Sequence, residues 1–142
     1  MRFWDSSAVV PILVAEPNSR RMASLLRRDR ECWVWWTTRT ECLSALYRRE
    51  RGGELKPKQL DAARERLRLF DRAAATIVPS EAVRSRAERL LAAHVLRADD
   101  AMQLAAALVA AEENAANLPI VTLDDRLAEA ARREGFSVLT GK

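Results

Sequence analysis

Short apolar runs alternate along the chain with longer segments in which apolar residues recur every three or four positions. Runs rich in β-branched or aromatic residues are typical of buried strands, and the longer periodic segments are typical of helices that pack on one face. The pattern predicts about five strands. These lie at residues 2–4, 32–36, 76–78, 120–122 and 136–139.

About seven helices are expected between these runs, and several carry residues that favour a helix start or end. Residues 17–19 break the chain between the first two helices, Thr37 and Thr38 can cap the third, and Pro57 can open the fourth. The expected helices lie at residues 6–15, 20–29, 39–51, 57–74, 80–93, 99–113 (from Asp99 or Asp100) and 125–134.

Strands that alternate with helices need crossover connections, which produce a parallel sheet with helices on both faces. We therefore expect an α/β fold of three layers with a mainly parallel sheet. The chain has 142 residues, of which 49% are apolar, so it can form one sizeable hydrophobic core. No internal repeat, linker or low-complexity segment divides it. The sequence predicts a single domain over residues 1–142.

The composition excludes several kinds of active site. With one His, His94, the chain cannot form a two-His ribonuclease site or an H-E-x-x-H zinc site, and His94 is expected in a surface loop. Two Cys are too few for a thiolate-rich zinc site or a disulfide framework, which favours the reducing cytoplasm. No glycine opens a helix after a strand, as a phosphate-binding loop requires. No apolar run reaches the roughly 18 residues that span a membrane.

Basic residues are concentrated in one part of the chain. The net charge is +4, yet residues 17–72 hold 15 basic and 8 acidic side chains, a net +7. One interpretation is that these arginines simply face solvent, as arginines on helices usually do. A coding bias toward Arg would also raise their number without any link to function. The other interpretation is a surface that binds a polyanion. The candidate phosphate contacts are Arg39, Arg48, Arg49, Arg51 and Lys56.

Four carboxylates follow predicted strands or begin predicted helices. Asp5 follows the first strand, Glu41 lies near the start of the third helix, Asp100 begins the Ala-rich helix, and Asp124 follows the strand at 120–122. The ends of parallel strands and the starts of the helices that follow them share one edge of the sheet, where such sheets bind ligands. We expect these four side chains at that edge.

These acids have two interpretations. Asp5, Asp100 and Asp124 would each serve well as a helix cap and nothing more. Glu41 borders an apolar helical stripe with no Lys nearby, so it needs a partner. Clustered carboxylates repel one another, and oxygen ligands without His or Cys favour Mg²⁺ or Mn²⁺. Such an ion would bind phosphate oxygens and lower the pKa of a bound water, which suggests metal-assisted hydrolysis of a phosphodiester.

Four segments resemble the motifs of PIN-domain ribonucleases, in particular the VapC toxins of type II toxin–antitoxin systems. Residues 5–10 (DSSAVV) resemble D-[TS]-S-A-[LV]-V, and residues 39–46 (RTECLSAL) resemble R-x-E-x-x-x-A-L. Residues 96–105 (LRADDAMQLA) resemble L-R-x-x-D-A-L-H-L-A, and residues 121–128 (VTLDDRLA) resemble V-T-x-D-x-R-L-A. The segments keep the family's order and cover nearly the whole chain.

The resemblance implies a PIN-like sandwich that cleaves RNA endonucleolytically with Mg²⁺ or Mn²⁺. It implies a homodimer and a small VapB-like antitoxin whose C-terminal segment covers the active site. Gln103 stands where the family often has His, at a position that is not a usual metal ligand. Motif register selects Asp100 over Asp99 and Asp124 over Asp125. The implied acidic site is Asp5, Glu41, Asp100 and Asp124, supported by Ser7, Thr122 and Asp99.

Two alternative functions differ from a toxin in what they require of the chain. A housekeeping RNA-processing nuclease of the same fold would share the site but would not arrest growth. A receiver-like signalling domain would need an acidic pair near the first strand and a Lys after the last, whereas no Lys lies between Lys58 and Lys142. Trp33 and Trp35 are expected in the core, although exposed tryptophans can also stack on RNA bases.

Overall fold

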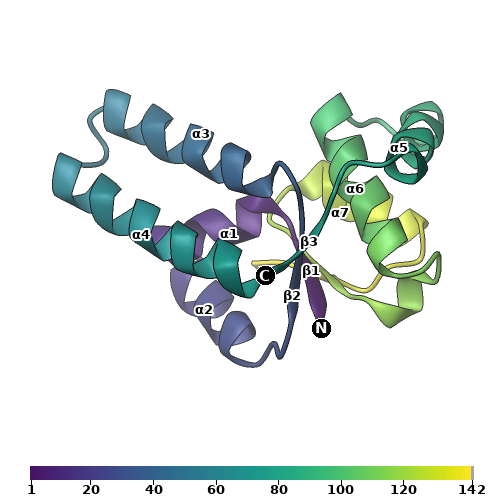
Figure 1. The fold of residues 1–142 in the computed structure, drawn as a ribbon, viewed down its shortest axis with the longest axis horizontal. Coiled ribbons are helices and arrows are strands. Elements are labelled where there is room, and N and C mark those ends of the chain that lie inside the picture. The colour runs from purple at the N-terminus through teal and green to yellow at the C-terminus, as the bar shows by residue number, and fades with distance from the viewer. Residues whose placement is uncertain (142) are drawn as a thin grey trace.

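A computed structural model describes residues 1–141 and has one five-stranded sheet (Figure 1). The strand order is β3-β2-β1-β4-β5, and every neighbouring pair is parallel, as expected for strands joined by crossover helices. The strands are β1 (Arg2–Trp4), β2 (Cys32–Trp35), β3 (Ala75–Ile77), β4 (Ile120–Val121) and β5 (Val138–Leu139).

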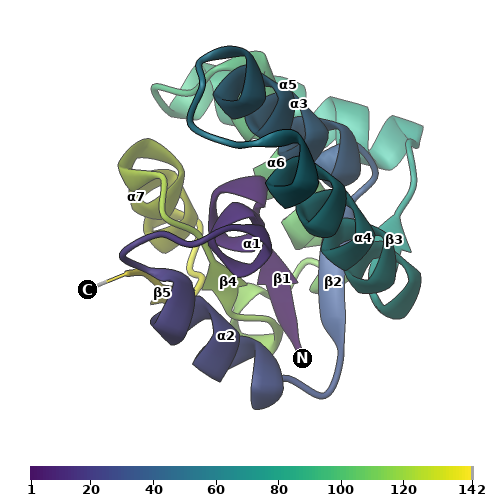
Figure 2. The ribbon, with the colours of Figure 1, turned by 90° about the vertical axis from the view of Figure 1, so that its left-hand side faces the viewer.

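Helices cover both faces of the sheet, which confirms the predicted three-layer α/β architecture. Helices α1 to α4 lie on one side of the sheet and α5 to α7 on the other (Figure 1). Figure 2 looks onto the first side, with α1 and α2 in front of the strands. No helix in the described part of the chain is both long and apolar enough to cross a membrane. The helices are α1 (Ser6–Leu13), α2 (Ser19–Arg27), α3 (Thr38–Arg51), α4 (Pro57–Ala73), α5 (Glu81–Ala93), α6 (Ala98–Ala110) and α7 (Asp125–Arg133), with a short 3₁₀ turn at Ala115–Asn117.

Alternating strand residues divide the interior into two cores. Phe3 and Trp4 are 1% and 0% exposed and point to opposite faces of the sheet. Phe3 joins Trp35 in the core beneath α5, α6 and α7, whereas Trp4 joins Val34 in the core beneath α1 to α4. The central strands β1 and β4 are therefore buried on both sides, which explains why they read as apolar runs in the sequence.

The tryptophan cluster of the second strand is only partly buried. Trp35 is buried and Trp33 is half-buried against the same core, which confirms that both pack in the interior. The strand ends at Trp35, one residue earlier than predicted, and Trp36 is 59% exposed.

The Ala-rich helix begins and ends earlier than the sequence suggested. It starts at Ala98 with Arg97 as its N-cap, so neither Asp99 nor Asp100 begins it. It ends at Ala110 because the chain turns into positive φ at Glu112 and Glu113, with φ of 53° and 63°.

His94 is not the surface-loop residue that the sequence suggested. It is the C-cap of α5, and its side chain is only 8% exposed. Its Nε2 lies 2.7 Å from Oε1 of Glu134. The two oxygens of the Glu134 carboxylate also accept hydrogen bonds of 3.2 and 2.9 Å from the Arg89 guanidinium. The imidazole therefore ties the end of α5 to the end of α7.

The strand order reverses direction at β1, the central strand. The chain runs from β1 outward through β2 to β3, and later returns to place β4 on the other side of β1. The segments that follow β1 and β4 consequently leave toward opposite faces, into α1 and α7. In open parallel sheets the crevice at such a point binds ligands. The order also differs from the 2-1-3-4-5 order of receiver-like domains, which argues against that alternative.

Candidate active site

Asp5 lies at the carboxyl end of β1 and caps α1. Its Oδ2 accepts hydrogen bonds from the Ser7 amide (3.2 Å), the Thr122 hydroxyl (3.0 Å) and the Ser7 hydroxyl. Its Oδ1 has no hydrogen-bond partner among residues 1–141, and no basic group in that range forms an ion pair with it. A carboxylate that only capped a helix would have no need of this burial, since Asp5 is 5% exposed.

Burial dominates the electrostatics of Asp5. It raises the pKa of Asp5 from 3.8 to about 6, against hydrogen bonds from Ser7 and Thr122 that lower it, and the negative charge of Glu41 raises it further. The ionised form is thus disfavoured and lacks a counter-charge. A cation beside the carboxylate would remove this penalty.

Ser7 and Thr122 join the ends of β1 and β4. Their hydroxyl oxygens are 3.2 Å apart. The Leu123 amide donates to Ser7 Oγ (2.8 Å), and the Asp124 amide donates to Thr122 Oγ1 (3.1 Å). The supporting positions given to these residues by the motif resemblance therefore lie directly against Asp5 and at the start of α7.

Glu41 lies in the first turn of α3, and neutral donors surround its carboxylate. Oε1 accepts from the Thr37 hydroxyl (2.6 Å), and Oε2 accepts from the Ser6 hydroxyl (2.8 Å) and the Gln103 amide (3.0 Å). The sequence indicated that Glu41 needs a partner, and within the described chain its partners are neutral donors and not a basic side chain. Sequence reasoning gave Ser6 and Gln103 no part in the site and interpreted Thr37 only as a helix cap, although Thr37 precedes Glu41 by one helical turn and so had the spacing to contact it.

Asp100 and Asp124 form a second acidic pair at the starts of α6 and α7. Asp100 Oδ2 accepts from the Arg97 amide at 3.4 Å, and Asp124 Oδ1 accepts from the Leu127 amide at 2.8 Å. Burial raises the pKa of Asp100, and the negative charges of Asp99 and Asp124 raise it further. Both aspartates therefore cap helices, and each also lies within electrostatic reach of the other.

The four predicted carboxylates are brought together as two pairs, Asp5 with Glu41 and Asp100 with Asp124. Within residues 1–141, no three His, Cys, Asp or Glu side chains lie close enough to hold a metal ion as they stand. The donor chemistry nevertheless fits a hard divalent cation, because all four donors are carboxylates and the buried Asp5 has an unpartnered oxygen. These residues supply the ligand types of a metal site without forming a closed set.

A hollow of about 420 Å³ opens beside Glu41. Arg48 and Arg49 line it together with Asp99, and Glu16 forms an ion pair with Arg49. Arg48 lies seven residues after Glu41, on the same face of α3, and is exposed. The exposed guanidinium of Arg48 and the carboxylate of Glu41 thus line the same hollow.

The other three basic candidates lie away from this hollow. Arg39 forms a 3.1 Å ion pair with Asp71 of α4. Arg51 ends α3 ten residues after Glu41, about 15 Å along the helix axis. Lys56 lies in the connection between α3 and α4, which is far from the sheet (Figure 1).

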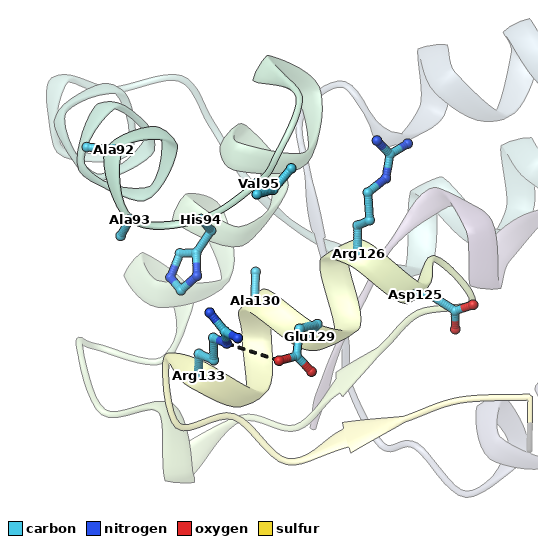
Figure 3. Close-up of a pocket in the computed structure, with 9 residues that line it drawn as sticks. All are labelled: Ala92, Ala93, His94, Val95, Asp125, Arg126, Glu129, Ala130 and Arg133. Carbon is cyan, nitrogen blue, oxygen red and sulfur yellow. Dashed lines mark hydrogen bonds and ion pairs between the residues drawn. The ribbon is translucent and has the colours of Figure 1, made fainter.

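A second hollow, of about 470 Å³, lies between the α5–α6 connection and α7 (Figure 3). Val95, 87% exposed, lies on one side of it, and a 3.0 Å ion pair joins Glu129 and Arg133 on the other. Asp125, the first residue of α7, also lines this hollow. None of the four predicted site carboxylates lines it. Asp125 therefore lines a different hollow from Glu41 and Asp99.

The chain resembles known proteins in both sequence and fold. A family model described as PIN domain matches residues 2–133. No curated protein sequence matches the chain.

Three solved structures share the fold over almost the whole chain. A toxin–antitoxin complex from Klebsiella pneumoniae is 15% identical with a TM-score of 0.67, covering 100% of this chain and 98% of the other. The FitAcB structure from Neisseria gonorrhoeae is 18% identical with a TM-score of 0.68, covering 99% and 98%. A FitAB structure bound to an IR36 DNA fragment is 17% identical with a TM-score of 0.69, covering 99% and 95%. At these identities the likeness concerns the fold.

Proposed function

The chain belongs to the PIN domain family, and from this premise we propose that it is a single-domain, metal-dependent endoribonuclease. We propose further that it acts in the cytoplasm as the toxin of a type II toxin–antitoxin pair. The observation that carries the enzymatic proposal is Asp5, a buried carboxylate without a counter-charge at the point where the sheet order reverses. Two cysteines without a disulfide fit a reducing compartment.

The proposed metal ligands are Asp5, Glu41, Asp100 and Asp124, with Mg²⁺ or Mn²⁺ as the ion. When bound, the ion supplies a Lewis acid that lowers the pKa of water and offsets charge on the phosphodiester oxygens. Ser7 and Thr122 hold Asp5 Oδ2, which leaves Oδ1 as the oxygen that would bind the ion. Asp99 lies on the rim of the hollow, where its charge adds to the attraction for a cation.

Arg48 is the proposed phosphate contact nearest the acids. Replacing it by Ala should raise KM for single-stranded RNA while kcat stays unchanged, because the side chain grips substrate and touches none of the four carboxylates. The slope of log KM against log salt should become shallower by about one unit. Steady-state cleavage at several salt concentrations measures both effects.

Arg51→Ala is the matched control, since it removes the same charge from the far end of α3. It should leave KM within about twofold of wild type, which is the level of a solvated surface charge. Equal KM values for the two variants would remove Arg48 from the substrate path.

The toxin proposal is distinguished from a housekeeping nuclease by expression in bacteria. A toxin should arrest growth within one or two generations, whereas Asp5→Asn, expressed at the same level, should not. Co-expression of the small protein encoded beside the gene should restore growth. Normal growth at high expression of an active nuclease would favour the housekeeping alternative.

The proposed protein partner is a small antitoxin whose C-terminal segment covers the acidic site. The fold shared with a chain of the toxin–antitoxin complex from Klebsiella pneumoniae supports this partner. A segment seated over the hollow would compete with RNA for Arg48 and with the metal for Glu41. We also propose a homodimer, for which light scattering of the purified chain is the direct measurement.

A further inference from the structure

Gln103 is a buried polar side chain between the two acidic pairs. It lies on α6, 2% exposed, three residues after Asp100 and so near the same face of the helix. Its amide nitrogen donates to Glu41 Oε2 at 3.0 Å and to Thr38 Oγ1 at 3.3 Å. Gln103 therefore connects the helix that carries Asp100 to the helix that carries Glu41.

The orientation of this amide is dictated by Glu41. With Nε2 against the carboxylate, Oε1 of Gln103 is buried and has no hydrogen-bond partner in the described chain. An unpartnered buried acceptor is unfavourable, and a hydrogen bond to an ionised carboxylate is stronger than one between neutral groups. Turning the amide over would place Oε1 against Glu41 Oε2, so that two acceptors would face each other. The observed orientation thus keeps the hydrogen bond to Glu41 and leaves Oε1 without a partner in the described chain.

The donors to Glu41 come from different parts of the fold. Ser6 belongs to α1 and Thr37 precedes α3, and both offer hydroxyls that can rotate. Among the donors to Glu41 in residues 1–141, Gln103 alone comes from α6. It is therefore the contact that sets where Glu41 lies relative to Asp100.

We propose that Gln103 is a positioning residue that holds the Glu41 carboxylate in place for the metal without cancelling its charge. This inference rests on the proposed metal-dependent function. A Lys or Arg in its place would pair with Glu41 and neutralise it, whereas a neutral amide fixes the oxygen and leaves its full charge available to a cation. Groups that orient metal ligands in this way typically contribute 10-fold to 100-fold to metal affinity or activity.

Gln103→Met tests this role, because Met has a similar length and no donor. Mn²⁺ binding to the RNA-free protein, followed by the electron paramagnetic resonance of free Mn²⁺, should weaken by about 10-fold to 100-fold. RNA cleavage should show a lower kcat with an unchanged KM, because Gln103 acts through Glu41 and not on the substrate. Gln103→His keeps a ring N–H donor and should recover most of the Mn²⁺ affinity.

Leu108→Ala is the structural control. Leu108 lies on the same helix, is 5% exposed and belongs to the core beneath α5 to α7. Its truncation should lower the Tm. Mn²⁺ affinity should stay within about twofold, since Leu108 lies eight residues after Asp100, about 12 Å along the helix axis, and a cavity there leaves the ligands in place. An equal loss of affinity in Leu108→Ala and Gln103→Met would overturn the proposal.

Gln103→Leu supplies a second variant if the Met protein does not fold. It is apolar and has no hydrogen-bond donor for Glu41, so it should bind Mn²⁺ as weakly as Gln103→Met. In a Glu41→Ala background, Gln103→Met should have no more than about a twofold further effect, because its partner is gone. A further tenfold loss there would overturn the assignment to Glu41.

The wild-type protein separates this proposal from the one on which it rests. Wild type that neither binds Mn²⁺ nor cleaves RNA would overturn both. Wild type that does both, together with a Gln103→Met variant of equal Mn²⁺ affinity, would overturn the role of Gln103 alone.

Discussion

Asp5→Asn is expected to reduce RNA cleavage by at least about 100-fold, since loss of a group that merely orients a metal ligand already costs 10-fold to 100-fold. Asn preserves the shape of the side chain and can still cap α1, but it removes the negative charge from the point where β1 and β4 end. The loss should fall on kcat, because Asp5 is a proposed metal ligand and, at 5% exposed, is not expected to contact the substrate. Single-turnover cleavage of a labelled RNA at saturating Mn²⁺ measures it.

Asp125→Asn is the matched control for this variant. It makes the same chemical change one residue from Asp124, at an exposed position that lines the other hollow. Its cleavage rate should stay within about twofold of wild type, as expected for a surface charge outside the site. A similar loss in both variants, or no loss in Asp5→Asn, would mean that the acidic edge does not carry the chemistry.

The same Asp5→Asn substitution is expected to stabilise the metal-free protein. The pKa of Asp5 is raised from 3.8 to about 6 in the folded chain, mainly by burial. Stability that is fully present below pH 3.8 is therefore lost as the pH rises through about 6. Above pH 7 the loss amounts to about 3 kcal/mol, and Asn does not incur it. In EDTA at pH 7.5, the variant should melt roughly 10 °C above wild type.

The pH dependence of the difference distinguishes this cause from a packing effect. At pH 3 the two proteins should have nearly equal Tm values, because Asp5 is then protonated in both the folded and the unfolded chain. Millimolar Mn²⁺ should raise the Tm of wild type and leave Asp5→Asn nearly unchanged, since the ion binds only the native carboxylate cluster. A Tm difference that is constant from pH 4 to pH 8 would contradict the desolvation of Asp5.

The sequence predicted the fold well because its central strands are short and buried on both faces. Runs such as Arg2–Trp4 and Ile120–Val121 fill two cores at once, so their apolar character is visible without tertiary information. Boundaries that depend on local backbone conformation were less predictable. The positive φ of Glu112 and Glu113, which ends α6, has no glycine to mark it.

The candidate site was predictable where it follows chain topology. Asp5 and Asp124 lie at strand ends, and parallel pairing brings such ends to one edge. The contacts of Glu41 were not predictable, because Ser6 and Gln103 reach it from α1 and α6 through packing that no spacing rule describes. His94 was misread for a similar reason, since its partner Glu134 is forty residues away. Sequence patterns thus indicated which acids gather, and the structure shows which neutral groups hold them.

Cleavage of single-stranded RNA by the purified wild-type chain, with and without a divalent ion, tests the central claim most directly. Protein stripped of metal should be inactive in EDTA, and adding Mg²⁺ or Mn²⁺ should restore endonucleolytic products with a saturable dependence on the ion. Ca²⁺ at the same concentration serves as the comparison, because it takes more ligands at longer distances than this acidic edge is expected to supply. Cleavage that persists in EDTA, or none in any metal, would contradict a metal-dependent ribonuclease.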